Sequence, residues 1–412
     1  MSNTSLHKFL EAVSDMASER CGQVFTDQMT NLLAERDRLF KNSWRDIDAT
    51  TLSDDERKKL LREVDFDTMT SHAGQFLDSA SYPNFLFQVA QTALKFGELE
   101  KASRLFIAIV TKHARFCEDF LLARIHINLS KIAYQQNNFD LAQQELKTSL
   151  RLFEKIKDTK GIISVQNRLA TILIDQGKLE EGKKYLLEAL EAAQNAKLNT
   201  TLASIHVNLG NVANILGKWN DAIDHFKNAL QILGKDTNDS LRASLNLNLA
   251  NVHMQQGNFP KAEAQIKESN LYSDRSNLRH QRGLSYLVQS EIACRKRDYS
   301  AANALVVTAF HIFSEMGDRL RVADVYRVLG MISRDSGHPE QAESYFENSR
   351  RINTDLSNPL NLGETLFELG QLYKTAGENA KATDVFREAI TNFKRMNAVS
   401  RMLETEIALS TL

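Results

Sequence analysis

The chain has 412 residues, of which 42% are hydrophobic and 25% are charged, and its 51 basic and 52 acidic side chains give a formal net charge of −1. Such a balance offers no general attraction for nucleic acid or for an anionic membrane surface, so we expect partners of neither class. No stretch reaches the 18 apolar residues of a membrane span and the N-terminus lacks the apolar core of a signal peptide, which predicts a cytoplasmic protein.

Residues 1–80 form the first segment, and they do not share the periodicity of the rest of the chain. Apolar spacing predicts four helices here, over residues 6–13, 24–40, from 53 onward and 68–77. Ser53 with Glu56 has the spacing of a capping box, which starts the third helix. We interpret the segment as a helical cap on the elements that follow. The alternative is an effector surface with its own partner.

From residue 82 to residue 397 one pattern recurs every 40 residues without an insertion. Each unit has a small residue in its first half: Ala90, Ser130, Ala170, Gly210, Ala250, Ser290, Gly330 and Gly370. Twelve positions later stands Ala or Gly: Ala102, Ala142, Gly182, Ala222, Ala262, Ala302, Ala342 and Ala382. Sixteen positions later stands a large apolar residue: Phe106, Leu146, Leu186, Phe226, Ile266, Val306, Phe346 and Phe386. A fixed period of this length indicates a repeat architecture.

The spacing inside one unit indicates two amphipathic helices joined by a turn. We expect the small column to pack against the alanine column, and the large apolar column to fill the space between neighbouring units. The sequence therefore predicts an all-α fold, a right-handed α-solenoid of eight antiparallel helix pairs over residues 82–397. Residues 398–412 have the phase of one more first helix and are predicted to cap the C-terminal end.

These columns resemble the signature of tetratricopeptide repeat (TPR) proteins, although the family's usual unit is about 34 residues long. The 40-residue period, with N-L-G-N at 208–211 and N-L-A-N at 248–251, is similar to the Leu-Gly-Asn subgroup. That subgroup includes spindle-orientation adaptors, kinesin light chains and bacterial peptide-sensing regulators of the Rap type. The resemblance implies a concave groove, lined by the first helix of each unit, that holds a partner peptide.

Asparagines mark the expected groove. In the resembling families the Asn before Leu-Gly holds the backbone of an extended peptide, and this role carries over to Asn128, Asn208 and Asn248. Asn211 and Asn251 stand three positions after Asn208 and Asn248, on the same side of each helix. If these side chains face solvent, replacing them will leave folding nearly unaffected. The alternative is that they only solvate an exposed helix face.

Basic side chains extend this prediction. Arg124 stands early in its helix, as do arginines that clasp acidic peptide side chains in the adaptor members. Lys131 and Arg168 are a fragment of the clamp with which co-chaperone members hold a terminal carboxylate. The predicted peptide-binding set is therefore Arg124, Asn128, Lys131, Arg168, Asn208, Asn211, Asn248 and Asn251, and an acidic peptide would suit it. Four arginines could add to a basic interior, namely Arg168, Arg295, Arg327 and Arg334, although nearby Glu291 and Asp324 could neutralise the C-terminal ones.

No arrangement typical of catalysis or of metal binding is visible, so we expect neither an enzyme nor a cofactor. The segment G-K-L-E-E-G-K-K at 177–184 has a P-loop-like start, but Lys184 replaces the magnesium-binding hydroxyl residue. The predicted function is a protein–protein interaction module or scaffold that binds a peptide. The alternative is a peptide-sensing regulator in which binding repositions residues 1–80.

Overall fold

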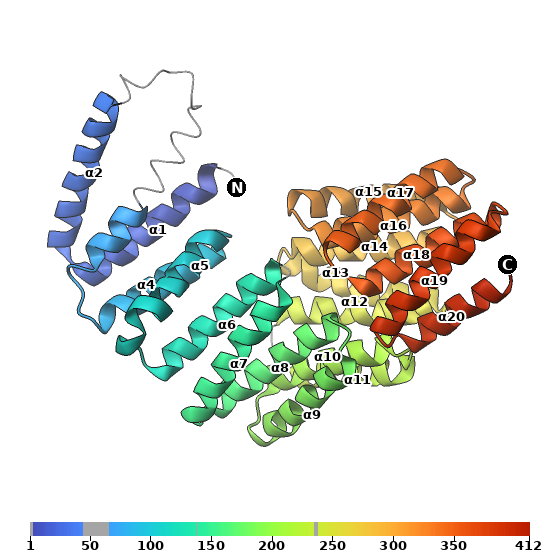
Figure 1. Ribbon diagram of the computed structural model, residues 1–412, viewed down its shortest axis with the longest axis horizontal. Helices are drawn as coiled ribbons and strands as arrows, with labels where there is room; N and C mark the ends of the chain where they lie inside the picture. Colours follow the sequence, from blue (N-terminus) through green and yellow to red (C-terminus); the bar gives the residue numbers. More distant parts are fainter. Residues whose placement is uncertain (1–2, 44–65, 137, 235–237) are drawn as a thin grey trace. The chain divides into compact units, whose positions relative to one another are not determined.

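The chain is helical throughout the residues that the computed structural model describes, namely 3–43, 66–136, 138–234 and 238–412 (Figure 1). The predicted all-α class is confirmed, because no strand occurs in these ranges. Within the same ranges, no helix is both long and apolar enough to cross a membrane. Internal contacts divide the chain into two compact units, Met1–Lys157 (unit 1) and Asp158–Leu412 (unit 2).

Unit 1 consists of N-terminal helices followed by two helix pairs. Its elements are α1 (Asn3–Cys21), α2 (Gln23–Ser43), a short helix over 66–73, α4 (Ser81–Lys95), α5 (Leu99–Ala108), α6 (Asp119–Gln135) and α7 (Phe139–Lys155). Between α5 and α6 the chain makes a π-helical turn, Ile109–His113, and then a 3-10 turn, Ala114–Phe116. Three of the four predicted N-terminal helices are therefore present, while the predicted capping box at Ser53 and Glu56 lies outside the described residues.

The N-terminal helices share a core with the first helix pair. Val13 and Ala17 of α1 and Phe25 of α2 are buried in the same cluster as Phe85 of α4 and Phe106 of α5. This packing is what we expect of a cap, because it covers an apolar face that the first pair would otherwise expose. The proposed boundary near residue 81 reflects a change of sequence period, whereas the division by contacts falls after residue 157.

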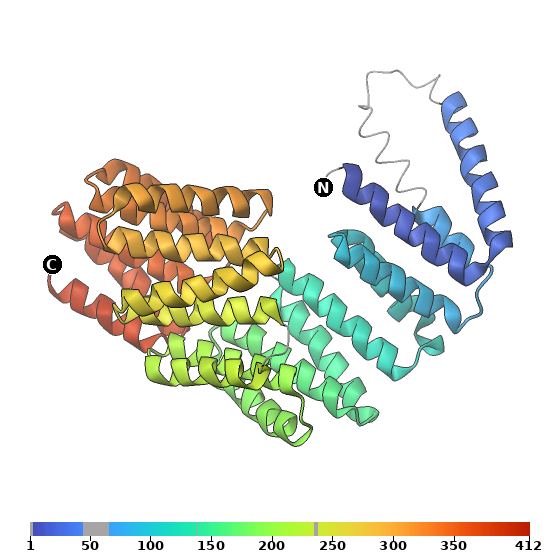
Figure 2. The same ribbon diagram turned by 180° about the vertical axis from the view of Figure 1, so that it is seen from behind.

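Unit 2 is an uninterrupted series of helix pairs that lie side by side in both views (Figures 1 and 2). The pairs are α8 (Thr159–Asp175) with α9 (Leu179–Asn195), α10 (Asn199–Ile215) with α11 (Trp219–Leu233), α12 (Asp239–Gln255) with α13 (Phe259–Arg275), α14 (Arg279–Arg295) with α15 (Tyr299–Glu315), α16 (Arg319–Asp335) with α17 (Pro339–Asp355), and α18 (Pro359–Thr375) with α19 (Asn379–Arg395). The predicted C-terminal helix is α20 (Val399–Ser410).

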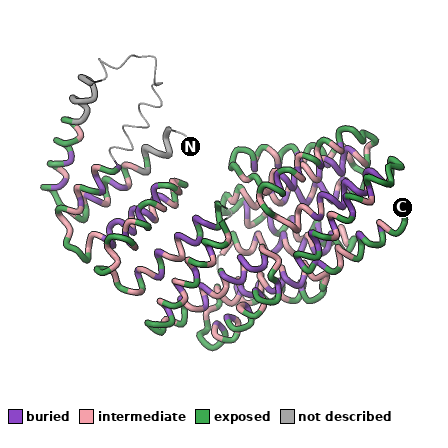
Figure 3. Tube along the Cα trace, in the orientation of Figure 1, coloured by how far each residue is buried: buried purple, intermediate pink, exposed green. Residues whose placement is uncertain are grey.

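The 40-residue period is kept by the helices themselves. First helices begin at Asp119, Thr159, Asn199, Asp239, Arg279, Arg319, Pro359 and Val399. Second helices begin at Leu99, Phe139, Leu179, Trp219, Phe259, Tyr299, Pro339 and Asn379. The predicted solenoid of packed helix pairs is thus confirmed, and buried residues recur along its helices (Figure 3).

The small column packs against the alanine column, as expected. A Cβ on Gly182 would lie 3.1 Å from the Ala170 carbonyl oxygen. In another pair, Ser290 Oγ donates to the Ala302 carbonyl oxygen at 2.8 Å.

The small column also has a second partner, which we did not expect. A Cβ atom on Gly210 would lie 2.5 Å from the ring of Phe226, which belongs to the large column of the same pair. The same crowding occurs at two more glycines, Gly330 under Phe346 and Gly370 under Phe386. Real Cβ atoms do not approach this closely, so these three rings require a glycine beneath them, whereas the first unit combines Phe106 with Ala90. The large column therefore fills the space within a pair, and the small column is matched to it in size.

Candidate peptide-binding surface

The eight predicted site residues lie on first helices of both units. Unit 1 contains Arg124, Asn128 and Lys131, all on α6, and unit 2 contains the rest: Arg168, Asn208, Asn211, Asn248 and Asn251. The unit 2 residues follow one another on α8, α10 and α12, which are first helices of consecutive pairs. The repeat thus places the same helix face of each pair in register.

Asn208 is half-buried and bonded to the preceding pair. Its Nδ2 donates to Asn167 Oδ1 at 2.9 Å and to Thr171 Oγ1 at 3.1 Å, both on α8. An amide nitrogen carries two hydrogens, so both donors of Asn208 are used inside unit 2 and its Oδ1 acceptor remains. The expectation that these asparagines contribute nothing to folding is therefore wrong for Asn208, because its side chain ties two first helices together.

Asn248 repeats the arrangement one pair later, where its Nδ2 donates to Asn211 Oδ1 at 3.2 Å. We call the five connected side chains the amide ladder: Asn167, Thr171, Asn208, Asn211 and Asn248. In each bond the donor stands two positions before the small residue of its unit. The acceptor belongs to the preceding unit and stands either one position after or three positions before the small residue there. The next such pair along the chain would be Asn251 with Val288, and valine has no polar group to offer.

Asn251 stands at the next ladder position, three residues after Asn248, and no bond connects it to the five; we call it the open end of the amide ladder. It is half-buried on α12, and its side chain makes no hydrogen bond to another described residue. Its amide offers two donors and one acceptor. Oδ1 of Asn208 and Oδ1 of Asn248 add two further acceptors on the same helix face.

Arg168 stands beside this ladder on α8. Its side chain is exposed, and no carboxylate among the described residues pairs with it. Partial withdrawal from water lowers the pKa of Arg168, and no acidic neighbour counteracts that effect. An unpaired guanidinium is suited to bind a carboxylate through two parallel hydrogen bonds.

The unit 1 residues have other local roles. The Arg124 guanidinium lies over the rings of Phe87, at 4.8 Å, and Phe120, at 5.8 Å. Asn128 Nδ2 donates to the Arg124 carbonyl oxygen at 2.9 Å, within its own helix. Lys131 is exposed. Arg124 and Lys131, together with the ring of Phe120, give α6 a surface with basic and aromatic side chains.

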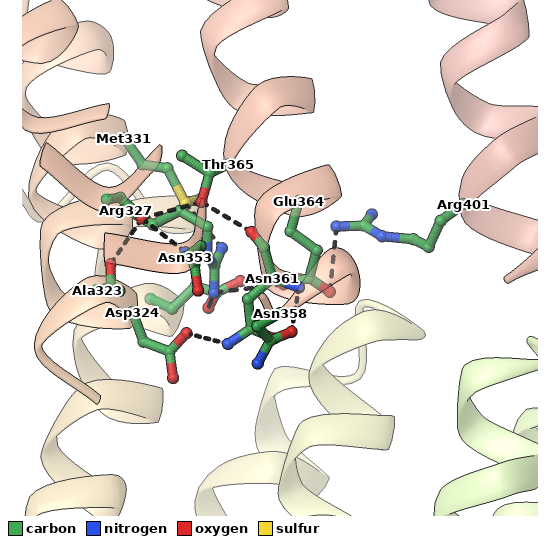
Figure 4. Close-up of polar contacts among 12 residues, drawn as sticks. Ala323, Asp324, Arg327, Met331, Asn353, Asn358, Asn361, Glu364, Thr365 and Arg401 are labelled. Carbon is green, nitrogen blue, oxygen red and sulfur yellow. Dashed lines mark hydrogen bonds and ion pairs between the residues drawn. The ribbon is translucent and has the colours of Figure 1, made fainter. Parts of the chain in front are cut away.

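A chain of ion pairs runs through the C-terminal pairs of unit 2. Glu291 on α14 is bonded to Arg295 at 2.8 Å and lies 3.5 Å from Arg327 of α16. Arg327 continues to Glu364 of α18 at 3.8 Å, and Glu364 continues to Arg401 of α20 at 3.8 Å (Figure 4). With Glu404, which Arg401 contacts at 2.7 Å, we call these six residues the charge ladder.

Because Glu291 of the charge ladder is buried, its carboxylate keeps its charge through its pairing with arginines. Burial alone would raise the pKa of Glu291, but the positive charges of Arg327 and Arg295 outweigh it and hold that pKa below its usual range. Arg334 is likewise paired, with Glu368 at 2.6 Å and with Asp335 at 2.8 Å. The C-terminal part of the possible basic interior is therefore neutralised, because Arg295, Arg327 and Arg334 each have a carboxylate partner, whereas Arg168 has none among the described residues.

Beside the charge ladder lies a cavity of about 600 Å³, which the sequence did not indicate. Its wall combines charged and apolar side chains from α10, α11, α14, α16, α18 and α20, among them Asn214, Trp219, Arg334, Glu364, Phe367, Arg401, Leu403 and Ile407. Leu403 and Ile407 are 54% and 58% exposed, and Asn214 Oδ1 is buried with no hydrogen-bond partner among the described residues. A sequence signal did exist: Leu403 stands where the equivalent positions of the preceding pairs carry Ala323 or Gly363.

Two histidines face each other across the α10/α11 pair. His206 Nδ1 and His225 Nδ1 are 3.1 Å apart, so one nitrogen donates and the other accepts. Burial lowers the pKa of His206, and the neighbouring His225 lowers it further. Burial also lowers the pKa of His225, partly offset by Asp221 and Asp224. Both shifts favour the neutral form of the pair.

Comparison with known proteins supports the repeat assignment. The tetratricopeptide repeat family model matches residues 161–235, 201–269 and 321–395. No curated protein matches the sequence significantly.

Several solved structures share the fold along most of the chain. A Rap protein complexed with competence and sporulation factor aligns with a TM-score of 0.64 at 13% identity, covering 92% of this chain and 99% of that one. The apo form of the quorum sensor NprR from B. thuringiensis aligns with a TM-score of 0.57 at 12% identity, covering 89% and 97%. Aspartyl phosphate phosphatase F from Bacillus subtilis aligns with a TM-score of 0.56 at 14% identity, covering 94% and 95%. Residues 161–269 and 321–395 therefore match the tetratricopeptide repeat model, and the chain has a helical solenoid fold similar to that of these solved structures.

Proposed function

We propose that the chain is a non-catalytic peptide-binding protein, and that an extended partner segment lies along the first helices α8, α10 and α12 of unit 2. The observation that supports this most directly is the open end of the amide ladder at Asn251. An extended peptide exposes alternating N–H donors and C=O acceptors, which an amide side chain can satisfy together. Asn251 can do so without giving up a bond inside the protein.

Arg168 sets the preferred chemistry of that segment. Its guanidinium has no carboxylate partner among the described residues, unlike the paired arginines of the charge ladder. A ligand carboxylate would supply the missing partner. We therefore propose a partner peptide with an acidic side chain or a free C-terminus near Arg168.

The structural neighbours support a peptide-related role through the fold alone. One of them is complexed with competence and sporulation factor and another is a quorum sensor, at 13% and 12% identity. At such identity the individual binding residues cannot be transferred. The proposal for this chain therefore depends on its own side chains.

The test begins with affinity capture by the full chain and identification of the bound peptide by mass spectrometry. Calorimetry then compares Asn251→Ala and Arg168→Ala with the wild type. Each change should weaken binding about five- to tenfold, on the order of one net hydrogen bond, while leaving the melting temperature unchanged. Asn220→Ala is the matched control, because Asn220 is an exposed asparagine on the second helix of the α10/α11 pair. Equal affinity in all four proteins would refute the proposed surface.

A peptide-sensing regulator is the second candidate, and one observation favours it. The N-terminal helices belong to unit 1, whereas the amide ladder lies in unit 2. Two compact bodies in one chain are what a sensor needs in order to report binding in one as a change in the other. Hydrogen exchange of α1 and α2, measured with and without the captured peptide, separates the candidates: a sensor changes their protection and a scaffold does not.

A further inference from the structure

The turns of the solenoid do not require glycine for their backbone conformation. Residues with positive φ recur at the turns, and six of them are not glycine: Lys157, Lys197, Asn277, Arg297, Ser357 and Asn397, with φ between 48° and 64°. The left-handed conformation is therefore tolerated here with a side chain present, at a modest energetic cost. A glycine at such a turn needs another reason whenever its surroundings are crowded.

Two glycines of unit 2 have that second reason. A Cβ on Gly177 would lie 2.4 Å from the carbonyl oxygen of Arg395, and a Cβ on Gly217 would lie 2.4 Å from Cβ of Ser400. Three glycines at equivalent turns meet nothing within 4 Å: Gly257, Gly337 and Gly377. The crowding is thus specific to the turns inside the first two helix pairs of unit 2, α8/α9 and α10/α11, which touch the end of α19 and the start of α20.

These contacts join the two ends of unit 2. Ile215, next to the Gly217 turn, packs against the same core cluster as Leu409 of α20. We call the close approach of Gly177 and Gly217 to Arg395 and Ser400 the α20 seam. Beneath it lies the 600 Å³ cavity, with Asn214 and Trp219 on one side and Leu403 and Ile407 on the other.

Elsewhere α20 packs on the C-terminal core cluster through Ala408, Met402 and Leu409, and it adds a few polar contacts. Arg401 lies 3.8 Å from Glu364, and Lys374 Nζ donates to the Ala408 carbonyl oxygen at 3.3 Å. Three apolar side chains spaced four apart on α20 remain about half exposed, namely Val399, Leu403 and Ile407 at 49%, 54% and 58%. The helix is thus attached less completely than a helix in the middle of the solenoid, which has a neighbour on each side.

We propose that α20 is a lid on this cavity, kept shut by the α20 seam, and that ligand enters the cavity when α20 leaves the Gly177 and Gly217 turns. The cavity is suited to an apolar peptide segment. Its carboxylates Glu364 and Glu368 are already paired with Arg401 and Arg334, so no unpaired charge demands a charged ligand. Asn214 Oδ1 offers an acceptor for one ligand N–H. The inference that the ligand is a peptide rests on the proposed peptide-binding function, whereas the inference that α20 is a lid does not.

The seam can be opened by one methyl group. Gly217→Ala places a Cβ against Ser400, and Gly257→Ala is a matched control, because both glycines have φ +72° and Gly257 has open space around it. Ser400→Gly removes the Cβ and Oγ atoms at 2.4 and 2.9 Å and leaves only Cα at 3.7 Å, an ordinary contact distance. The double variant Gly217→Ala/Ser400→Gly should therefore restore closure. Placing alanine at positive φ costs the same free energy in both alanine variants. The difference in exchange rate between the two variants therefore reports only the crowding against Ser400.

Hydrogen exchange of residues 402–410, detected by mass spectrometry on the full ligand-free chain, is the first measurement. Gly217→Ala should speed exchange there about tenfold or more relative to Gly257→Ala, and Ser400→Gly in the same chain should reverse most of that change. Equal exchange in the two alanine variants, or failure of Ser400→Gly to rescue, would overturn the lid. The lid would also be overturned if the amides of α20 in the wild-type chain already exchanged at the rate of unprotected amides.

The second measurement uses whatever peptide is captured by the wild-type chain. Its association rate should rise in Gly217→Ala and return toward the wild-type value in the double variant. A rate that is unchanged while exchange responds as expected would show that α20 opens but that this peptide binds elsewhere. That outcome overturns the access role of the lid and leaves the proposed peptide binding intact.

Discussion

The first helices α8, α10 and α12 are joined by neutral amides, whereas α14, α16, α18 and α20 are joined by charged side chains. Both ladders use the same face of the same 40-residue unit. The amide ladder leaves donors and acceptors open at its end, but the charge ladder pairs each of its members. One repeat architecture can therefore present an adaptable surface in one stretch and a fixed, internally satisfied one in the next.

The largest effect should come from breaking the charge ladder at Arg327. Arg327→Met removes the partner that Glu291 and Glu364 share, and Glu291 is only 7% exposed. Glu291 then keeps only Arg295 and Glu364 keeps only Arg401. The loss should therefore approach, without reaching, the cost of a fully uncompensated buried charge, about 3–5 kcal/mol, and the urea midpoint of unit 2 should fall strongly. Arg319→Met removes an exposed pair with Asp355 and should cost less than about 1 kcal/mol. Similar midpoints for the two variants would mean that the charge ladder is solvated.

A somewhat smaller effect should follow from crowding the core of the amide-ladder half. Gly210→Ala brings a Cβ to 2.5 Å from the Phe226 ring, and overpacking of this kind costs about 1–3 kcal/mol. Phe226→Leu in the same chain should recover part of that loss, because Leu186 faces Ala170 in the preceding pair. Thermal denaturation of the two single variants and the double variant measures the coupling. Additive effects would contradict the proposed size matching.

The amide ladder itself should contribute modestly to stability. Asn208→Ala deletes two hydrogen bonds to α8 and should lower the free energy of unfolding by about 1–2 kcal/mol. Asn251→Ala deletes none within the described residues and should be neutral. Urea denaturation of both variants distinguishes the closed part of the ladder from its open end, and equal losses would show that the distinction is wrong.

The smallest effect is a pH dependence in the same half of unit 2. Unfolded histidines titrate near pH 6.5, and the pKa values of His206 and His225 are lower than this in the folded chain. As pH falls through 6.5, the unfolded chain binds protons that the folded chain does not, so stability decreases toward acid. His206→Gln, which copies Gln166 of the preceding pair, should flatten the change in melting temperature between pH 7.5 and pH 5.5. If the melting temperature of His206→Gln depends on pH as it does in the wild type, the histidine pair is not the source of that dependence.

Periodicity was sufficient to predict the fold. A strict 40-residue phase specifies where each helix begins, and the columns at Gly210 and Phe226 specify which faces are buried. The contact of the small column with the alanine column was predicted correctly, as Ser290 and Ala302 show, but its contact with the large column was not, because spacing along the chain does not reveal how far a facing side chain reaches across the contact. The one sequence signal for this contact is that glycine and phenylalanine occur together in the same unit, as Gly330 and Phe346 do.

The candidate site was predictable in part. The sequence indicated that Asn208 and Asn211 share a side of one helix, but not that bonds such as Asn248 to Asn211 connect one unit to the next. Such bonds depend on the lateral offset between neighbouring pairs, which the phase of the repeat does not define. For the cavity beneath α20 the sequence contained one signal, Leu403 in place of a small residue, but not the location of the cavity. The cavity forms between helices about 190 residues apart in sequence, and their separation depends on the curvature accumulated over many pairs.

The close approach of Gly217 to Ser400 has a consequence for the evolution and engineering of this chain. An open solenoid tolerates the gain or loss of a whole unit, because each pair needs only its neighbours. Here the two ends of unit 2 meet, so deleting or duplicating any 40-residue module between them would move α20 away from the turn it touches. The number of modules is therefore constrained by geometry, and divergence should proceed by substitution within modules and not by change in their copy number.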